Sequence, residues 1–133
     1  DKKGNEMKKR VLDVGQCNPD HMALRGLIES FGAEMDRVAL PSQAMELLEK
    51  DSYDLVLVNR KIDQDYSDGT ELIKMMKSNE KTRSIPVMLI SNLSDAQKEA
   101  VSLGAEKGFG KDYLRARNTV ELLQPYLGEP VHS

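Results

Sequence analysis

Residues 54–63 read DLVLVNRKID, and this stretch decides the fold. An unbroken apolar run at 55–58 leads directly into Asn59, and polar residues follow. A short, continuous apolar run predicts a strand covered on both faces, as in a parallel sheet. Ligands and chemistry gather at the carboxyl ends of such strands. The sequence therefore singles out Asn59 as a candidate functional residue.

The same reasoning extends outward along the chain. Further strands are predicted over residues 10–15, 33–39, 85–91 and 105–110. Amphipathic helices separate them, and a closing helix is predicted over 116–127. Each intervening helix has a polar residue at its expected start. Pro19 follows the polar residue of the first helix, and Gln97 lies at capping-box spacing from that of the fourth helix. These predicted starts are Asn18, Ser42, Asp68 and Ser94.

Strands that alternate with helices predict an α/β fold, with one open parallel sheet and helices on both faces. We expect a single domain over residues 10–127, between a flexible lead-in at 1–9 and a tail at 128–133. The carboxyl ends of the strands should meet at one edge of the sheet. The residues expected there are Gln16, Cys17, Asn59, Ser91 and Lys111.

Composition limits the classes of function. The 133 residues are 39% hydrophobic and 31% charged, with a net charge of −3, so the chain has no general attraction for nucleic acid or anionic membranes. No apolar run approaches the roughly 20 residues that span a bilayer. No secretory segment is recognisable, so a cytoplasmic location is expected. The single cysteine, Cys17, excludes an internal disulfide, and two distant histidines with no second thiol argue against a Cys/His zinc site.

Several phrases together resemble the receiver domain of two-component response regulators. The phrases that carry the resemblance are NPDHMALRGLIESFGAE (18–34), AMELLEKDSYDLVLVN (44–59), DGTELIKMMKS (68–78), IPVMLIS (85–91) and SLGAEKGFGK (102–111). The resemblance implies a flavodoxin-like (βα)5 sandwich with a five-stranded parallel sheet in the order 2-1-3-4-5. It also implies a phosphoacceptor aspartate, an acidic pair that holds Mg²⁺, a Ser or Thr, a lysine and a switch aromatic.

At several of those positions this chain has a residue of another type than the family. The resemblance places the phosphoacceptor on Asn59, the acidic pair on Gln16 and Cys17, the Ser/Thr on Ser91, the lysine on Lys111 and the switch aromatic on Gly108. Only Ser91 and Lys111 match the family's residue types. Asp112 replaces the proline that usually follows the lysine.

The substitutions remove the chemistry of phosphorylation. An amide nitrogen is a poor nucleophile because its lone pair is delocalised into the carbonyl group, whereas an acceptor carboxylate attacks phosphorus. Mg²⁺ prefers charged oxygen ligands, which Gln16 and Cys17 do not supply. We therefore expect no catalytic residue, metal or cofactor, and a pocket whose only remaining charge is that of Lys111. The Asn59 side chain is expected to hydrogen-bond to nearby loop backbone.

Three hypotheses follow. In the first, the chain is a non-phosphorylatable receiver-like signalling module, a pseudo-receiver, that binds a protein partner or a neighbouring domain of a longer chain. In the second, the degenerate pocket at Ser91 and Lys111 binds a small anion or metabolite. In the third, Asp63 or Asp65 serves as a substitute acceptor, although the sequence supplies no metal ligands for it. The sequence also leaves open whether the domain forms a weak homodimer.

One residue does not fit its predicted element. Alternation along the first strand places Asp13 on the same face as Val11, so its carboxylate should be buried. A buried carboxylate needs a partner. The sequence does not identify that partner.

Overall fold

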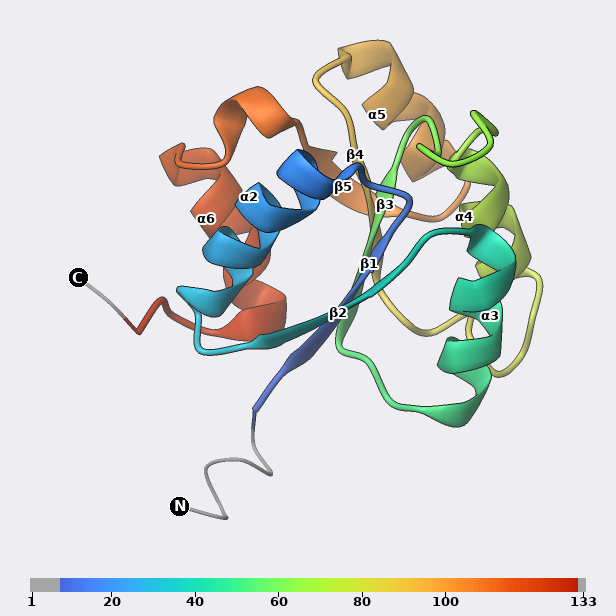
Figure 1. The fold of residues 1–133 in the computed structure, drawn as a ribbon, viewed down its shortest axis with the longest axis horizontal. Helices are drawn as coiled ribbons and strands as arrows, with labels where there is room; N and C mark the ends of the chain where they lie inside the picture. The colour runs from blue at the N-terminus through green and yellow to red at the C-terminus, as the bar shows by residue number, and fades with distance from the viewer. Residues whose placement is uncertain (1–7, 132–133) are drawn as a thin grey trace.

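A computed structural model describes residues 8–131, which form a parallel sheet with helices on both sides (Figure 1). The strands are β1 (Arg10–Val14), β2 (Glu34–Val38), β3 (Leu55–Asn59), β4 (Val87–Ile90) and β5 (Glu106–Phe109). The helices are α2 (Asn18–Glu29), α3 (Pro41–Lys50), α4 (Thr70–Lys77), α5 (Ser94–Ser102), the 3-10 turn η1 (Lys111–Tyr113) and α6 (Arg117–Leu127). No helix in this part of the chain is long and apolar enough to cross a membrane. Most of the predicted lead-in (1–9) and the end of the predicted tail (128–133) lie outside the described residues.

The strand order is β2-β1-β3-β4-β5, and all neighbouring strands are parallel. Helices α2 and α6 cover one face of the sheet, and α3, α4 and α5 cover the other (Figure 1). The predicted flavodoxin-like α/β fold with order 2-1-3-4-5 is therefore confirmed.

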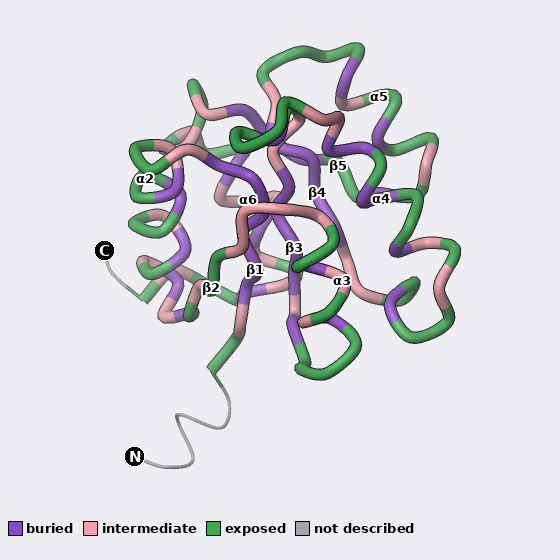
Figure 2. The backbone as a smooth tube through the Cα atoms, turned by 45° about the vertical axis from the view of Figure 1, so that its right-hand side comes forward, coloured by how far each residue is buried: buried purple, intermediate pink, exposed green. Residues whose placement is uncertain are grey.

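The sheet centre is buried on both faces, as the apolar runs predicted (Figure 2). Residues 55–58 of β3 and 87–90 of β4 are almost inaccessible to solvent. Side chains that alternate along these strands enter two separate apolar layers, one under α2 and α6 and the other under α3, α4 and α5. Continuous apolar sequence is needed here because a central strand has no solvent-facing side.

Strand positions match the sequence prediction to within two residues at each end, but the helix caps do not. Cys17, and not Asn18, occupies the N-cap position of α2. Helix α3 begins at Pro41, so Ser42 lies inside its first turn. Helix α5 begins at Ser94 without a side-chain cap, and the predicted capping box with Gln97 is absent. These cap predictions were wrong because each of these helices begins one or two residues earlier than predicted. The polar side chains that were expected to cap the helices therefore lie inside them.

Asp13 is completely buried, as predicted, and its partner is His21 of α2. The His21 Nδ1 lies 2.6 Å from the Asp13 Oδ2, and the imidazole is itself nearly buried. Burial raises the pKa of the Asp13 carboxyl group, and the hydrogen bond with His21 opposes that shift. The pair ties the sheet centre to the first turn of α2, because the two residues belong to β1 and α2 respectively.

Replacing His21 tests this tie. We expect His21→Ala to lower the free energy of unfolding by about 3 kcal/mol, because it leaves the Asp13 carboxylate buried without a partner. The double variant Asp13→Val, His21→Leu should be more stable than the single variant because no buried charge remains. Urea unfolding measures both. Arg25→Ala is the control, since it breaks an exposed ion pair with Glu29 on the same helix; an equal loss in the control and in His21→Ala would contradict the assignment.

Candidate functional site

The structure brings Asn59 and Lys111 into contact at the carboxyl edge of the sheet. Asn59 is the last residue of β3, and Lys111 begins η1 directly after β5. The Lys111 Nζ donates a hydrogen bond of 3.2 Å to the Asn59 Oδ1. The prediction that these two strand ends converge is therefore correct.

Both the nitrogen and the oxygen of the Asn59 amide form hydrogen bonds. Its Nδ2 donates to the carbonyl oxygen of Lys61 at 2.7 Å and to that of Gly15 at 3.2 Å. Gly15 follows β1 with a positive φ of 81°, a conformation that glycine adopts without strain. One amide therefore joins the end of β1, the end of β3 and the loop after β3, in addition to Lys111.

An unpredicted residue, Asp20, completes this arrangement. Its Oδ2 accepts a hydrogen bond of 2.7 Å from the Lys111 Nζ, so Lys111 contacts Asp20 and Asn59 at once. The Lys111 ammonium group holds the pKa of the Asp20 carboxyl group below its ordinary value. The expectation that Lys111 is the only charge left in the pocket was therefore wrong. Sequence reasoning missed Asp20 because an acidic residue in the first turn of a helix is common without any partner.

Gln16 and Cys17 follow β1, and their side chains form no hydrogen bond with Asn59 or Lys111 in the described part of the chain. The Gln16 side chain is buried, and neither of its amide atoms has a partner within residues 8–131. Cys17 is partly buried, and its carbonyl group accepts the His21 backbone N–H. Their side chains therefore do not join Asn59 and Lys111.

Ser91 lines the same surface hollow as Asn59 and Lys111. This hollow has a volume of about 390 Å³, and Arg60 and Lys61 also line it. The Ser91 Oγ accepts the backbone N–H of Leu93, the residue before α5. This hydrogen bond closes a local turn before α5 and does not cap the helix, and Ser91 also lines the wall of a basic pocket.

Gly108 lies on β5, where the side chain of Gln97 replaces part of the strand pairing. The Gln97 Oε1 accepts the Gly108 N–H at 2.9 Å, and its Nε2 donates to the carbonyls of Leu89 and Ser91. A Cβ atom at Gly108 would approach the Leu89 carbonyl oxygen to 2.2 Å. Only glycine fits at this position, because the backbone of β4 fills the space that a side chain would need.

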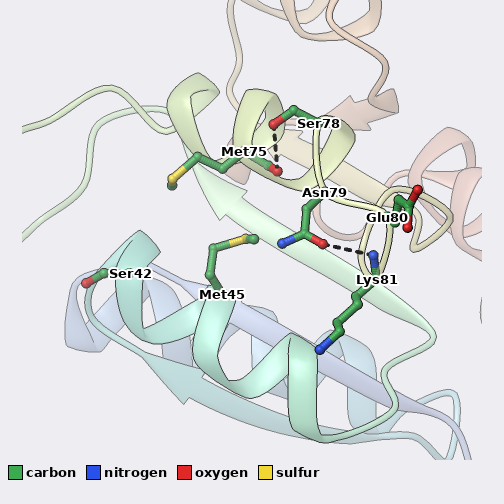
Figure 3. A pocket seen from close by; sticks show the side chains of 7 residues that line it. All are labelled: Ser42, Met45, Met75, Ser78, Asn79, Glu80 and Lys81. Carbon is green, nitrogen blue, oxygen red and sulfur yellow. Dashed lines mark hydrogen bonds between the residues drawn. The ribbon is translucent and has the colours of Figure 1, made fainter.

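A larger surface hollow lies away from this edge, between α3 and α4. Its volume is about 750 Å³, and Figure 3 shows Met45 and Met75 facing one another across it. The polar residues around it are Ser42, Ser78, Asn79, Glu80 and Lys81. Glu80 and Lys81 are the charged residues in this lining, which by itself indicates no chemistry.

Comparison with known proteins identifies the family. The model of the response regulator receiver domain matches residues 20–122, which is most of the chain. The chain belongs to the response regulator receiver domain family. This receiver domain is 25% identical over 124 residues to the polar-differentiation response regulator DivK of Brucella ovis, and the alignment covers 92% of this chain and 99% of that protein. DivK of Brucella anthropi is 24% identical with the same coverage.

Solved structures show the same fold. A putative response regulator from Chloroflexus aurantiacus superimposes with a TM-score of 0.79 at 18% identity, over 92% of this receiver domain and 99% of that chain. The receiver domain of the sensor histidine kinase PA1611 from Pseudomonas aeruginosa, which has a magnesium ion in its active-site cleft, gives a TM-score of 0.70 at 18% identity, with the same coverage.

A carboxylate at position 59 would conflict with its surroundings. In Asn59→Asp, an oxygen atom replaces the amide nitrogen and faces the Gly15 and Lys61 carbonyls, so we expect a loss of roughly 2 kcal/mol in the free energy of unfolding. Because Mg²⁺ binds oxygen ligands, it should restore part of this loss in the variant and leave the wild-type domain unchanged.

Urea unfolding with and without Mg²⁺ measures both effects. Asn92→Asp is the matched control, since it makes the same charge change at the same edge but keeps the oxygen that accepts the Asp112 N–H. A variant at position 59 that is as stable as this control would contradict the proposed role of the Asn59 amide.

The hydrogen bonds by which Gln97 joins β4 and β5 can be tested separately. Gln97→Ala should cost about 2 kcal/mol and speed hydrogen exchange at the Gly108 amide, because three backbone groups lose their partner. Lys98→Ala, at the next and exposed position of α5, should change stability by less than about 0.5 kcal/mol. Unchanged exchange at Gly108 would show that other groups hold β5 to β4.

Proposed function

We propose that this receiver domain is a non-phosphorylatable signalling module that acts through protein–protein interaction. The hydrogen bonding of Asn59 carries the proposal. Its amide nitrogen is a poor nucleophile, and both of its hydrogens are engaged by the Gly15 and Lys61 carbonyls. Asn59 is thus a degenerate phosphoacceptor position, with a structural role in place of a chemical one.

The other residues do not fit the magnesium ion that family membership implies. Gln16 and Cys17, which we assign to the acidic-pair positions, are a buried amide and a thiol, whereas Mg²⁺ prefers charged oxygen ligands. The Asn59 amide directs N–H groups, not oxygen atoms, at the two nearby carbonyls. No group of three or more His, Cys, Asp or Glu side chains converges within residues 8–131.

The position assigned to the switch aromatic supports a fixed conformation. Gly108 has no side chain that could exchange between two positions, and Gln97 holds its backbone against β4. The neighbouring Phe109 is buried in the apolar layer that α2 and α6 cover. Signalling by this domain then depends on whether its partner is present and not on a phosphorylation-driven change of shape.

Exposed apolar side chains on the segments that follow the strands support a protein partner. They come from four different segments that follow strands, and each is more than half exposed: Met22, Tyr66, Leu93 and Tyr113. Tyr66 has a positive φ of 61°, which a non-glycine residue rarely adopts, and its ring lies 5.1 Å from the Lys61 ammonium group. Large aromatic side chains of this kind are enriched at protein interfaces. The partner is a separate protein or a neighbouring domain of a longer chain; with a net charge of −3, nucleic acid is not the proposed partner.

Binding of a small oxyanion is the second candidate function. The observation that favours it is the basic lining of the hollow at Ser91, where Arg60, Lys61 and Lys111 meet and no carboxylate contributes. Three cations around one hollow attract anions. Substitute phosphorylation at Asp65 has no such support, because its carboxylate is engaged by the N–H and hydroxyl groups of Ser67.

Phosphodonor treatment tests the proposed function. We expect acetyl phosphate with Mg²⁺ to leave the mass of the domain unchanged, and Mg²⁺ followed by beryllofluoride to cause no saturable NMR shifts at Asn59 or Lys111. A receiver domain with an acceptor aspartate, treated in the same way, is the positive control. Covalent phosphate at any residue, including Asp63 or Asp65, would contradict the proposal, as would a phosphodonor that strengthens binding of a partner through this domain.

A further inference from the structure

Lys111 lies between two possible anion partners. On one side it lines the basic hollow of about 390 Å³, together with Arg60 and Lys61. On the other side it binds the Asp20 carboxylate at 2.7 Å. The side chains of Lys111 and Asp20 are 28% and 37% exposed, so water and small solutes can reach this pair.

Two of the cationic side chains that line the hollow, Arg60 and Lys61, hold no carboxylate within residues 8–131. The Nε of Arg60 is buried and has no hydrogen-bond partner within residues 8–131. The Lys61 ammonium group lies over the Tyr66 ring, a contact that leaves its N–H groups available to an anion. Among the cations that line the hollow, Lys111 is thus the one that already holds a carboxylate.

Building on the oxyanion-binding candidate above, we propose that Asp20 is a built-in counter-anion that competes with free oxyanions for Lys111. With Asp20 bound, the ammonium group is neutralised and points at α2 and Asn59. An inorganic phosphate ion in the hollow would take the same N–H groups, together with those of Arg60 and Lys61, and Asp20 would turn to solvent. Asp20 is therefore a residue that sets the affinity of the pocket and does not itself contact the ligand.

The physical basis is competition between like charges. A carboxylate on Lys111 both occupies its donors and repels a second anion a few ångströms away. The ion pair is partly exposed, so its own contribution is modest and exchange with solvent anions is feasible. Removing the charge at position 20 while keeping the shape should tighten phosphate binding by roughly tenfold, from the lost ion pair and the lost repulsion together.

NMR titration with inorganic phosphate at constant ionic strength tests the proposal. Asp20→Asn should bind phosphate roughly tenfold more tightly than the wild-type domain, with shifts at Lys111, Ser91 and Arg60. Adding Lys111→Gln should abolish the gain. Asp20→Ser is a second variant that removes the same charge in case the first one folds poorly. Asp63→Asn is the control, because it changes net charge equally and Asp63 is exposed in the loop that follows β3.

The outcomes separate this proposal from the function on which it is built. If the wild-type domain and Asp20→Asn bind phosphate equally well, oxyanion binding stands and competition by Asp20 is overturned. If neither binds phosphate, both fail. An equal gain in Asp63→Asn would show that net charge, and not the contact with Lys111, controls the affinity, which also overturns the proposal.

Discussion

One amide nitrogen joins the strand ends at the carboxyl edge of the sheet. Two backbone carbonyls, from Gly15 and Lys61, point at the Nδ2 of Asn59. Two carbonyl oxygens that face one atom require a donor or a cation between them. An asparagine provides two N–H groups and no charge, and its Nδ2 donates to both carbonyls. The same choice leaves the Asn59 oxygen as only a neutral acceptor for Lys111, which explains why the lysine also needs a carboxylate.

That carboxylate links the edge to the buried core. Asp20 and His21 are adjacent in the first turn of α2 and contact different elements: His21 pairs with Asp13 in the sheet, and Asp20 pairs with Lys111 after β5. Two side-chain pairs therefore hold this turn, and one of them is buried while the other is partly exposed. Gln97 makes a comparable bridge between α5, β4 and β5 on the other side of the site. Side chains, and not only backbone pairing, hold the strand ends in one arrangement.

The sequence predicted the parts of this structure that depend on local pattern. Apolar runs located the strands, and convergence of parallel strand ends placed Asn59 near Lys111, as observed. It also indicated that Asp13 is buried, but not that His21 is its partner. Contacts between distant residues left no local signal: Asp20 and Lys111 are 91 positions apart, and either residue is ordinary in its own element. The helix caps failed for a different reason, since backbone geometry and proline positions, and not the nearest polar residue, decide where each helix begins.

The two candidate functions use the same edge of the domain and are physically compatible. Met22, which is exposed, lies two residues after Asp20 on α2, and Tyr113 lies two residues after Lys111. An anion that displaces Asp20 from Lys111 removes one of the two restraints on the α2 turn, while the buried pair of Asp13 and His21 retains the other. The change would therefore be confined to the surface that carries these apolar side chains. A protein bound to this surface would sense the occupancy of the pocket without any rearrangement of the sheet, because Gln97 holds β5 to β4 in either state.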